Sequence, residues 1–161
     1  MKKIKPHGWA ILLFFLTGVV TFSAAEIQTA WAAHETQHGG ALVGLEVDGT
    51  EVAHAEWTLD AAQGFLTVYL TDAKAEKPEL TPQEMIDLTL YFEGDPAPVP
   101  MTLLAQPDPA TGKTSGDTSL FAGQSDRLKG ATAFKATIAS LFVAGQEVTD
   151  VSFSYPEGSH A

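Results

Sequence analysis

Two neighbouring stretches of sequence decide the fold, Glu51-Val-Ala-His-Ala-Glu-Trp-Thr-Leu-Asp60 and Phe65-Leu-Thr-Val-Tyr-Leu-Thr-Asp72. Apolar and polar residues alternate along both, and because successive side chains of a strand point to opposite faces, this period predicts two half-buried strands. The connection Asp60-Ala-Ala-Gln-Gly64 is short and ends in a glycine that can adopt positive φ, so the pair is predicted to form a hairpin. The predicted hairpin has an apolar inner face and a polar outer face that carries His54 beside Glu56.

Strand patterns continue on both sides of this hairpin. Residues 41–47 alternate before Asp48-Gly49, a dipeptide typical of a type I′ turn, in which both central residues need positive φ. A helix competes at Glu84–Glu93, but its evenly alternating apolar residues and its aromatic residues favour a strand. The other predicted strands are Val99–Ala105, Thr118–Ala122, Ala133–Ala144 and Gln146–Tyr155. Pro98 and Pro100 lack N–H donors, so the first of these is expected to begin at a sheet edge.

These seven to eight strands, without a long helical period, predict an all-β protein, an Ig-like antiparallel β-sandwich. The sandwich is expected to span residues 41–156, after a flexible, histidine-containing arm at 33–40, and to end in a C-terminal tail at 157–161.

Residues 1–32 are predicted to be a signal peptide. Lys2, Lys3 and Lys5 precede an uncharged run from Trp9 to Ala25, and Ala30-Trp-Ala32 places small residues at the two positions that signal peptidase inspects. The alternative is an uncleaved membrane anchor, because the apolar run approaches the ~17–25 residues that span a bilayer. Cleavage predicts a periplasmic or secreted protein with no membrane attachment.

The charge of the chain excludes some partners. Its formal net charge is −11, and removal of residues 1–32, with three Lys and one Glu, makes the remainder more acidic. Nucleic acid and anionic membrane surfaces both select Lys and Arg, so neither is expected as a partner. The chain has no cysteine, which excludes disulfides and a thiol nucleophile.

His34-Glu-Thr-Gln-His38 fits the H-E-x-x-H pattern of zinc proteases. That spacing needs a helix to bring both histidines to one side, and here Gly39-Gly40 follows directly. We therefore expect no protease activity. The histidines can still bind metal without catalysis, because imidazole and carboxylate suit copper and zinc. Cleavage after Ala32 would place a free amine next to His34.

A candidate metal site combines the arm with the central hairpin. If Gly40–Val47 pairs with Glu51–Asp60, His38 approaches His54 and Glu56. Two imidazoles and a carboxylate with an open position form a credible copper or zinc site. The predicted ligands are His34, His38, His54 and Glu56. The competing interpretation is a surface His54 that forms a hydrogen bond with a cross-strand neighbour.

No other stretch predicts catalysis. Thr111-Gly-Lys-Thr114 is similar to the end of a phosphate-binding loop, but Pro107 replaces the required earlier glycine.

Three segments together, His38-Gly-Gly40, His54-Ala-Glu56 and Val68-Tyr-Leu-Thr-Asp72, resemble small exported bacterial β-sandwich proteins. They are similar to YtkA-like domains and to accessory domains of heavy-metal efflux adaptors. The resemblance implies a periplasmic β-sandwich that handles metal.

The first hypothesis is an exported, non-enzymatic β-sandwich that binds a divalent transition metal, Cu or Zn, in the cell envelope. The second is a structural or interaction module that contacts another envelope protein and has no metal role. The third is a small oxidative copper enzyme with His34 as a terminal chelate.

Overall fold

The structure is a computed structural model that describes residues 36–107, 112 and 117–158, all within one unit of the chain, Ala32–Ala161. The predicted signal peptide, His34 and the last residues of the tail lie outside the described residues. The elements are eight strands and one 3₁₀ turn: β1 (Ala41–Val47), β2 (Thr50–Asp60), β3 (Phe65–Asp72), β4 (Met85–Tyr91), β5 (Val99–Ala105), β6 (Leu120–Gln124), η1 (Asp126–Leu128), β7 (Phe134–Val143) and β8 (Gln146–Tyr155).

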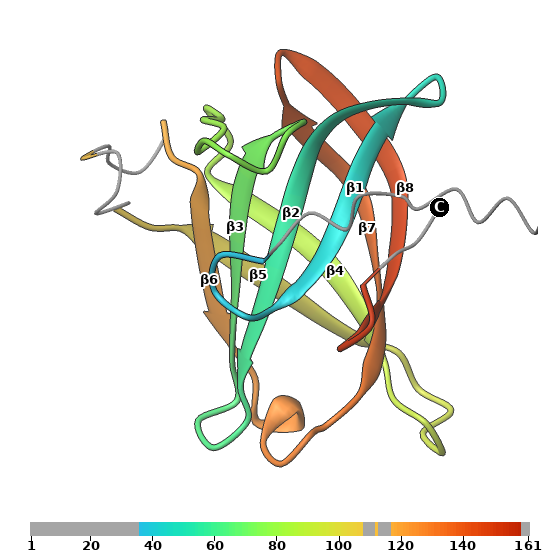
Figure 1. The fold of residues 1–161 in the computed structure, drawn as a ribbon. Coiled ribbons are helices and arrows are strands. Elements are labelled where there is room, and N and C mark those ends of the chain that lie inside the picture. Colours follow the sequence, from blue (N-terminus) through green and yellow to red (C-terminus); the bar gives the residue numbers. More distant parts are fainter. Residues whose placement is uncertain (1–35, 108–111, 113–116, 159–161) are drawn as a thin grey trace, which may run out of the picture. The chain divides into compact units, whose positions relative to one another are not determined.

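The strands form one antiparallel sheet with the order β1-β2-β3-β6-β5-β4-β7-β8 (Figure 1). The two end strands, β1 and β8, come into contact, so the sheet is nearly closed and barrel-like. The prediction of an all-β antiparallel protein with seven to eight strands is confirmed. The finer prediction, an Ig-like sandwich, is not confirmed by this arrangement and stays a prediction.

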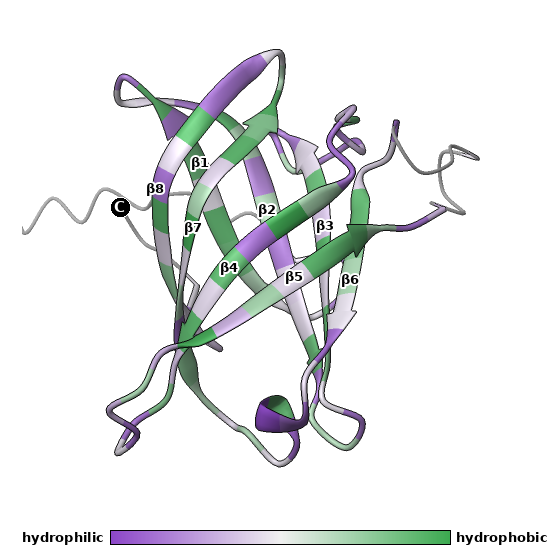
Figure 2. Ribbon diagram, turned by 180° about the vertical axis from the view of Figure 1, so that it is seen from behind, coloured by the Kyte–Doolittle hydropathy of each residue, from purple (hydrophilic) through white to green (hydrophobic). Residues whose placement is uncertain are grey.

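The local signals in the sequence correspond to the observed turns and strands. Asp48 and Gly49 both have positive φ, 52° and 73°, as a type I′ turn requires. Within residues 84–93, Met85–Tyr91 form strand β4 rather than the competing helix. Figure 2 shows the alternation along β4, where a hydrophilic band lies between hydrophobic ones.

Two boundaries depend on partners that are distant in sequence. Strand β6 begins two residues later than predicted, because Thr118 forms an isolated bridge with Thr81. Strand β5 pairs with β4 from Val99 to Leu104, but with β6 only at Leu104 and Ala105. Among the described residues the start of β5 therefore has a partner on one side only, as its prolines predicted.

The core lies inside the curved sheet and takes one apolar row from every strand. Trp57 is fully buried and stacks on Phe153 of β8, with 4.6 Å between the ring centroids. This contact joins two strands that are not neighbours in the sheet. Because side chains alternate along a strand, a buried Trp57 turns His54 and Glu56 to the opposite, outward face of β2.

Candidate functional site

The carboxylate of Glu56 is the centre of the site. Its Oε1 accepts hydrogen bonds from the backbone N–H groups of His38 (2.7 Å) and Gly40 (2.9 Å). Its Oε2 accepts from the backbone N–H of Gln37 (2.9 Å) and lies 3.0 Å from Nδ1 of His38. The arm residues Gln37–Gly40 are therefore fixed to the outward face of β2, whereas the sequence predicted a flexible segment.

Glu56 is only 2% exposed, so the arm buries the residue that it binds. Burial by itself raises the pKa of this carboxyl group, but the hydrogen bonds from Gly40, His38 and Gln37 favour the charged form. The net result is a pKa below the ordinary value of 4.5. Glu56 is thus ionised near neutral pH, and four donors already occupy its oxygens.

Gly40 allows the arm to lie this close to the sheet. A Cβ atom at this position would lie 2.3 Å from the carbonyl oxygen of Trp57, much closer than van der Waals contact allows. Only glycine therefore lets its backbone N–H reach Glu56 along this path.

The imidazole of His38 is held on two sides and open on a third. Because the ionised carboxylate of Glu56 only accepts hydrogen bonds, Nδ1 of His38 carries the proton and donates it. The ring stacks on Tyr69 of β3, with 3.6 Å between centroids and 5° between planes. The His38 side chain is 38% exposed, and its Nε2 has no hydrogen-bond partner among the described residues. When Nε2 carries no proton, the ring presents a lone pair at a fixed position.

His54 lies on the same face of β2 but is not joined to this pair. Its Nδ1 is 3.2 Å from the carbonyl oxygen of Asp72, and its Nε2 is 3.3 Å from Oε2 of Glu51. The side chain is 3% exposed, so His54 is not a surface residue, but its contact with Asp72 of β3 is the hydrogen bond to a cross-strand neighbour that the competing interpretation predicted. Both ring nitrogens have oxygen neighbours within the fold.

The loop after β3 is held by Asp72 and is tied to the arm. Oδ1 of Asp72 accepts hydrogen bonds from the backbone N–H groups of Glu76 (2.9 Å), Lys74 (3.2 Å) and Lys77 (3.4 Å). The bond from Glu76 is the main cause that lowers the pKa of Asp72. Gln37 of the arm donates from Nε2 to the carbonyl oxygen of Ala75 at 2.8 Å, which ties the arm to this loop.

The structure therefore brings together His38 and Glu56 of the four predicted ligands. His54 is nearby on the strand with separate partners, and His34 lies outside the described residues. In the described part of the chain, no three His, Cys, Asp or Glu residues are arranged to hold a metal ion. Sequence reasoning missed Gln37, Tyr69 and Asp72. Tyr69 could have been predicted from the register of the hairpin, which places it opposite Glu56.

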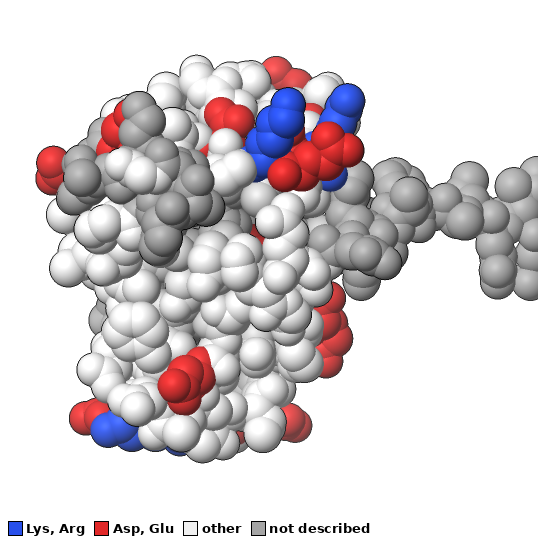
Figure 3. Space-filling model, turned by 60° about the vertical axis from the view of Figure 1, so that its left-hand side comes forward, with Lys and Arg blue, Asp and Glu red and all other residues white. Residues whose placement is uncertain are grey.

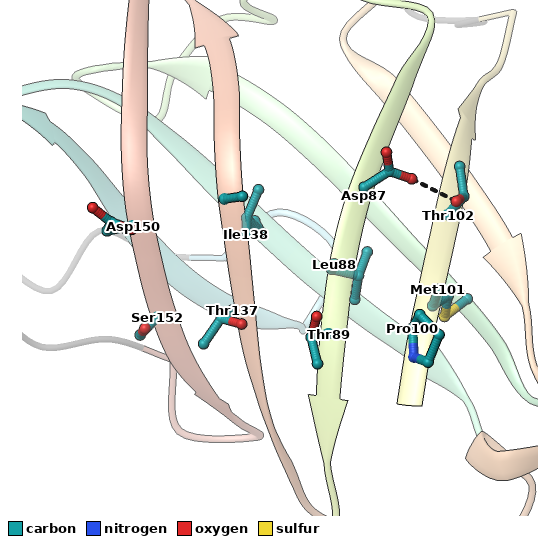
Figure 4. A pocket seen from close by; sticks show the side chains of 11 residues that line it. Asp87, Leu88, Thr89, Pro100, Met101, Thr102, Thr137, Ile138, Asp150 and Ser152 are labelled. Atoms are coloured by element: carbon teal, nitrogen blue, oxygen red, sulfur yellow. Dashed lines mark hydrogen bonds between the residues drawn. The ribbon is translucent and has the colours of Figure 1, made fainter. Parts of the chain in front are cut away.

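A shallow groove of about 720 Å³ lies elsewhere, on the outward side of β5, β4, β7 and β8. Thr89, Thr137 and Ser152 form a row of hydroxyl groups across it (Figure 4). Asp87 also lines the groove, and its carboxylate accepts a hydrogen bond of 2.5 Å from Oγ1 of Thr102. The groove contains no imidazole and shares no residue with the Glu56–His38 pair.

Comparison of the chain with protein-family models, with curated proteins and with solved structures gives no match. In the part of the chain that the structure describes, no helix is long and apolar enough to cross a membrane.

Proposed function

We propose that this chain is an exported, non-enzymatic protein that binds a divalent transition metal, copper or zinc, in the cell envelope. The observation that carries the proposal is the Glu56–His38 pair: a buried carboxylate holds Nδ1, and Nε2 points away from that bond. Histidines that bind metal commonly donate their other ring N–H to a carboxylate, which sets the tautomer and raises the basicity of the ligating nitrogen.

In this proposal His38 is a ligand and Glu56 positions it. Glu56 itself is a poor ligand, because its oxygens already accept hydrogen bonds from Gln37, His38 and Gly40. His54 is also a poor ligand, since its two ring nitrogens face Asp72 and Glu51. This reassigns two of the four predicted ligands.

His34 is the second proposed ligand. It precedes His38 by four residues, a distance of at most ~14 Å along an extended chain. A free N-terminal amine after cleavage at Ala32 would add a third donor. Such a set leaves coordination positions open, which suits a protein that takes up and releases metal rather than one with a closed structural site.

The finer fold and the location belong to the same proposal. Strands β1-β2-β3-β6 and β5-β4-β7-β8 would be the two layers of an Ig-like sandwich. The limited pairing of β6 with β5, at Leu104↔Ala122 and Ala105↔Phe121, supports this division. The N-terminal sequence pattern and the resemblance to YtkA-like domains support a periplasmic or secreted location.

Isothermal titration of the exported protein with Cu²⁺ and Zn²⁺ tests the metal role, after mass spectrometry has identified its N-terminus. We expect one metal per chain with a Kd well below millimolar. His38→Ala should weaken binding strongly, and Glu56→Gln by about 10–100-fold, the usual effect of removing the carboxylate partner. His54→Ala is the matched control and should leave the affinity unchanged.

Binding no tighter than millimolar, or binding unaffected by His38→Ala, would reject the proposal. The second candidate function, an interaction module of the envelope with no metal role, would then replace it. A separate observation favours that candidate: the outward residues of three adjacent strands carry no charge.

A further inference from the structure

The outward side of β3, β6 and β5 is free of charged residues. Alternation along these strands turns one set of side chains outward, and that set is Phe65, Thr67, Tyr69 and Thr71 on β3, Leu120, Ala122 and Gln124 on β6, and Pro100, Thr102 and Leu104 on β5. Figure 3 shows this side of the molecule as mostly uncharged, with most charged side chains toward its ends.

The apolar members of this side are contiguous. The register places Thr67 opposite Ala122, Ala122 opposite Leu104, and Leu104 opposite Met85 of β4. These residues therefore form a row across four neighbouring strands, flanked by Leu120 and Phe65. We call these six residues the uncharged face.

The uncharged face contains three of the five large hydrophobic side chains that are exposed in the described residues. Leu104 is 53% exposed, Met85 46% and Phe65 41%. Ala122 lies between them, 7% exposed and outside the core cluster, so the centre of the face carries a small side chain. Depletion of charge and exposed apolar side chains are the features of the inner part of a protein–protein interface.

We propose that the uncharged face is a contact surface between two copies of this chain. With a net charge of −11, two copies that approach through other surfaces bring acidic side chains together, and such like-charge contacts are costly. The uncharged face carries no charged side chain of its own, and Asp87, which borders it on β4, is hydrogen-bonded to Thr102. A basic partner protein would be attracted to the acidic residues on the other surfaces, so it would gain no electrostatic attraction at the uncharged face.

The size of the face determines the strength of the contact. A stable interface uses about 20–30 residues on each side, and the uncharged face has far fewer. The dimer should therefore be weak, with a Kd on the order of 10–100 μM. Because the rest of the two copies repel each other, added salt should strengthen the dimer by screening that repulsion.

Sedimentation equilibrium of the metal-free full exported chain, in EDTA, at 0.05 and 0.5 M NaCl tests this proposal independently of the metal role. We expect reversible dimers that are tighter at high salt, and at least a tenfold higher Kd for Leu104→Asp. Tyr91→Asp is the matched control: it adds the same charge at a side chain that is 44% exposed, at the other end of β4 and off the face. This control should dimerise like the parent protein.

A chain that stays monomeric to 1 mM in 0.5 M NaCl, on the order of ten times the expected Kd, would overturn the proposal. So would equal losses in the two variants, or a dimer that dissociates when salt is added. Circular dichroism checks that each variant is folded. If Leu104→Asp is not folded, Leu104→Thr, which suits an exposed strand position, replaces it and should also weaken the dimer.

Discussion

Replacement of Glu56 by Gln isolates the interaction that fixes the arm to the sheet. The side chain keeps its shape, but one oxygen becomes an NH₂ group. That group must then face either the N–H of Gln37 and Nδ1 of His38, or the N–H groups of His38 and Gly40. In the second orientation two donors point at a donor. In the first, only the Gln37 N–H does so when the His38 proton moves to Nε2 and Nδ1 accepts from the amide.

The expected cost follows from these contacts. Hydrogen bonds to a charged group contribute about 1.5–3 kcal/mol each, so the loss of one or two would cost about 1.5–6 kcal/mol if the arm stayed in place. The arm can instead leave the sheet and expose the new amide to water, which limits the loss. We expect the arm to undock and the free energy of unfolding to fall by about 2–4 kcal/mol, with the sheet intact.

Amide hydrogen exchange measured by NMR provides the assay. In the parent protein the amides of Gln37, His38 and Gly40 should be protected, and in Glu56→Gln they should exchange at nearly the rate of an unfolded chain. The shift of the His38 ring protons caused by stacking on Tyr69 should disappear at the same time. Glu46→Gln, the same change at an exposed position of β1, should alter stability by less than about 0.5 kcal/mol. Continued protection of the His38 and Gly40 amides in Glu56→Gln would refute this account of the site.

Three further predictions concern acid, the path of the arm and the core. The folded-state pKa of Glu56 lies below the unfolded value of 4.5, so the stability that its ionised carboxylate contributes is complete above pH 4.5 and is lost as the pH falls through the lowered pKa. NMR from pH 6 to 2 should show the arm undocking only in the acid range. A transition near neutral pH would contradict this expectation. Gly40→Ala should displace the arm and lower the free energy of unfolding by about 1–3 kcal/mol, because the new Cβ would lie 2.3 Å from the Trp57 carbonyl oxygen. The control is Gly39→Ala, at a position with a φ of 73° and no atom within 4 Å of the new Cβ. It should cost only about 1 kcal/mol in thermal unfolding. Trp57→Ala removes a fully buried ring that stacks on Phe153 and should cost about 3–5 kcal/mol in chemical denaturation, whereas a change below about 1 kcal/mol would show that the core does not depend on this contact.

The sequence by itself determined the strands and several turns, because both depend on neighbouring residues. Alternation located β3 at Phe65–Asp72 and β5 at Val99–Ala105 with the observed ends, and Asp48-Gly49 forms the turn that its residue types predict. With the predicted pairing of residues 40–47 and 51–60, the sequence also placed His38 near Glu56, within a set of four that included His34 and His54. These features follow from side-chain periodicity and backbone φ preferences, which are set over a few residues.

Only the tertiary structure decided the roles within the site. Glu56 was predicted as an exposed metal ligand, but the arm 16 to 19 residues earlier supplies the donors that surround its carboxylate. His54 is buried with Asp72 at the end of β3 and Glu51 beside its ring nitrogens, and the uncharged face exists because β6 lies between β3 and β5. Each of these outcomes depends on which distant segments meet. Alternation along one strand specifies which side chains share a face, but it does not specify what covers that face.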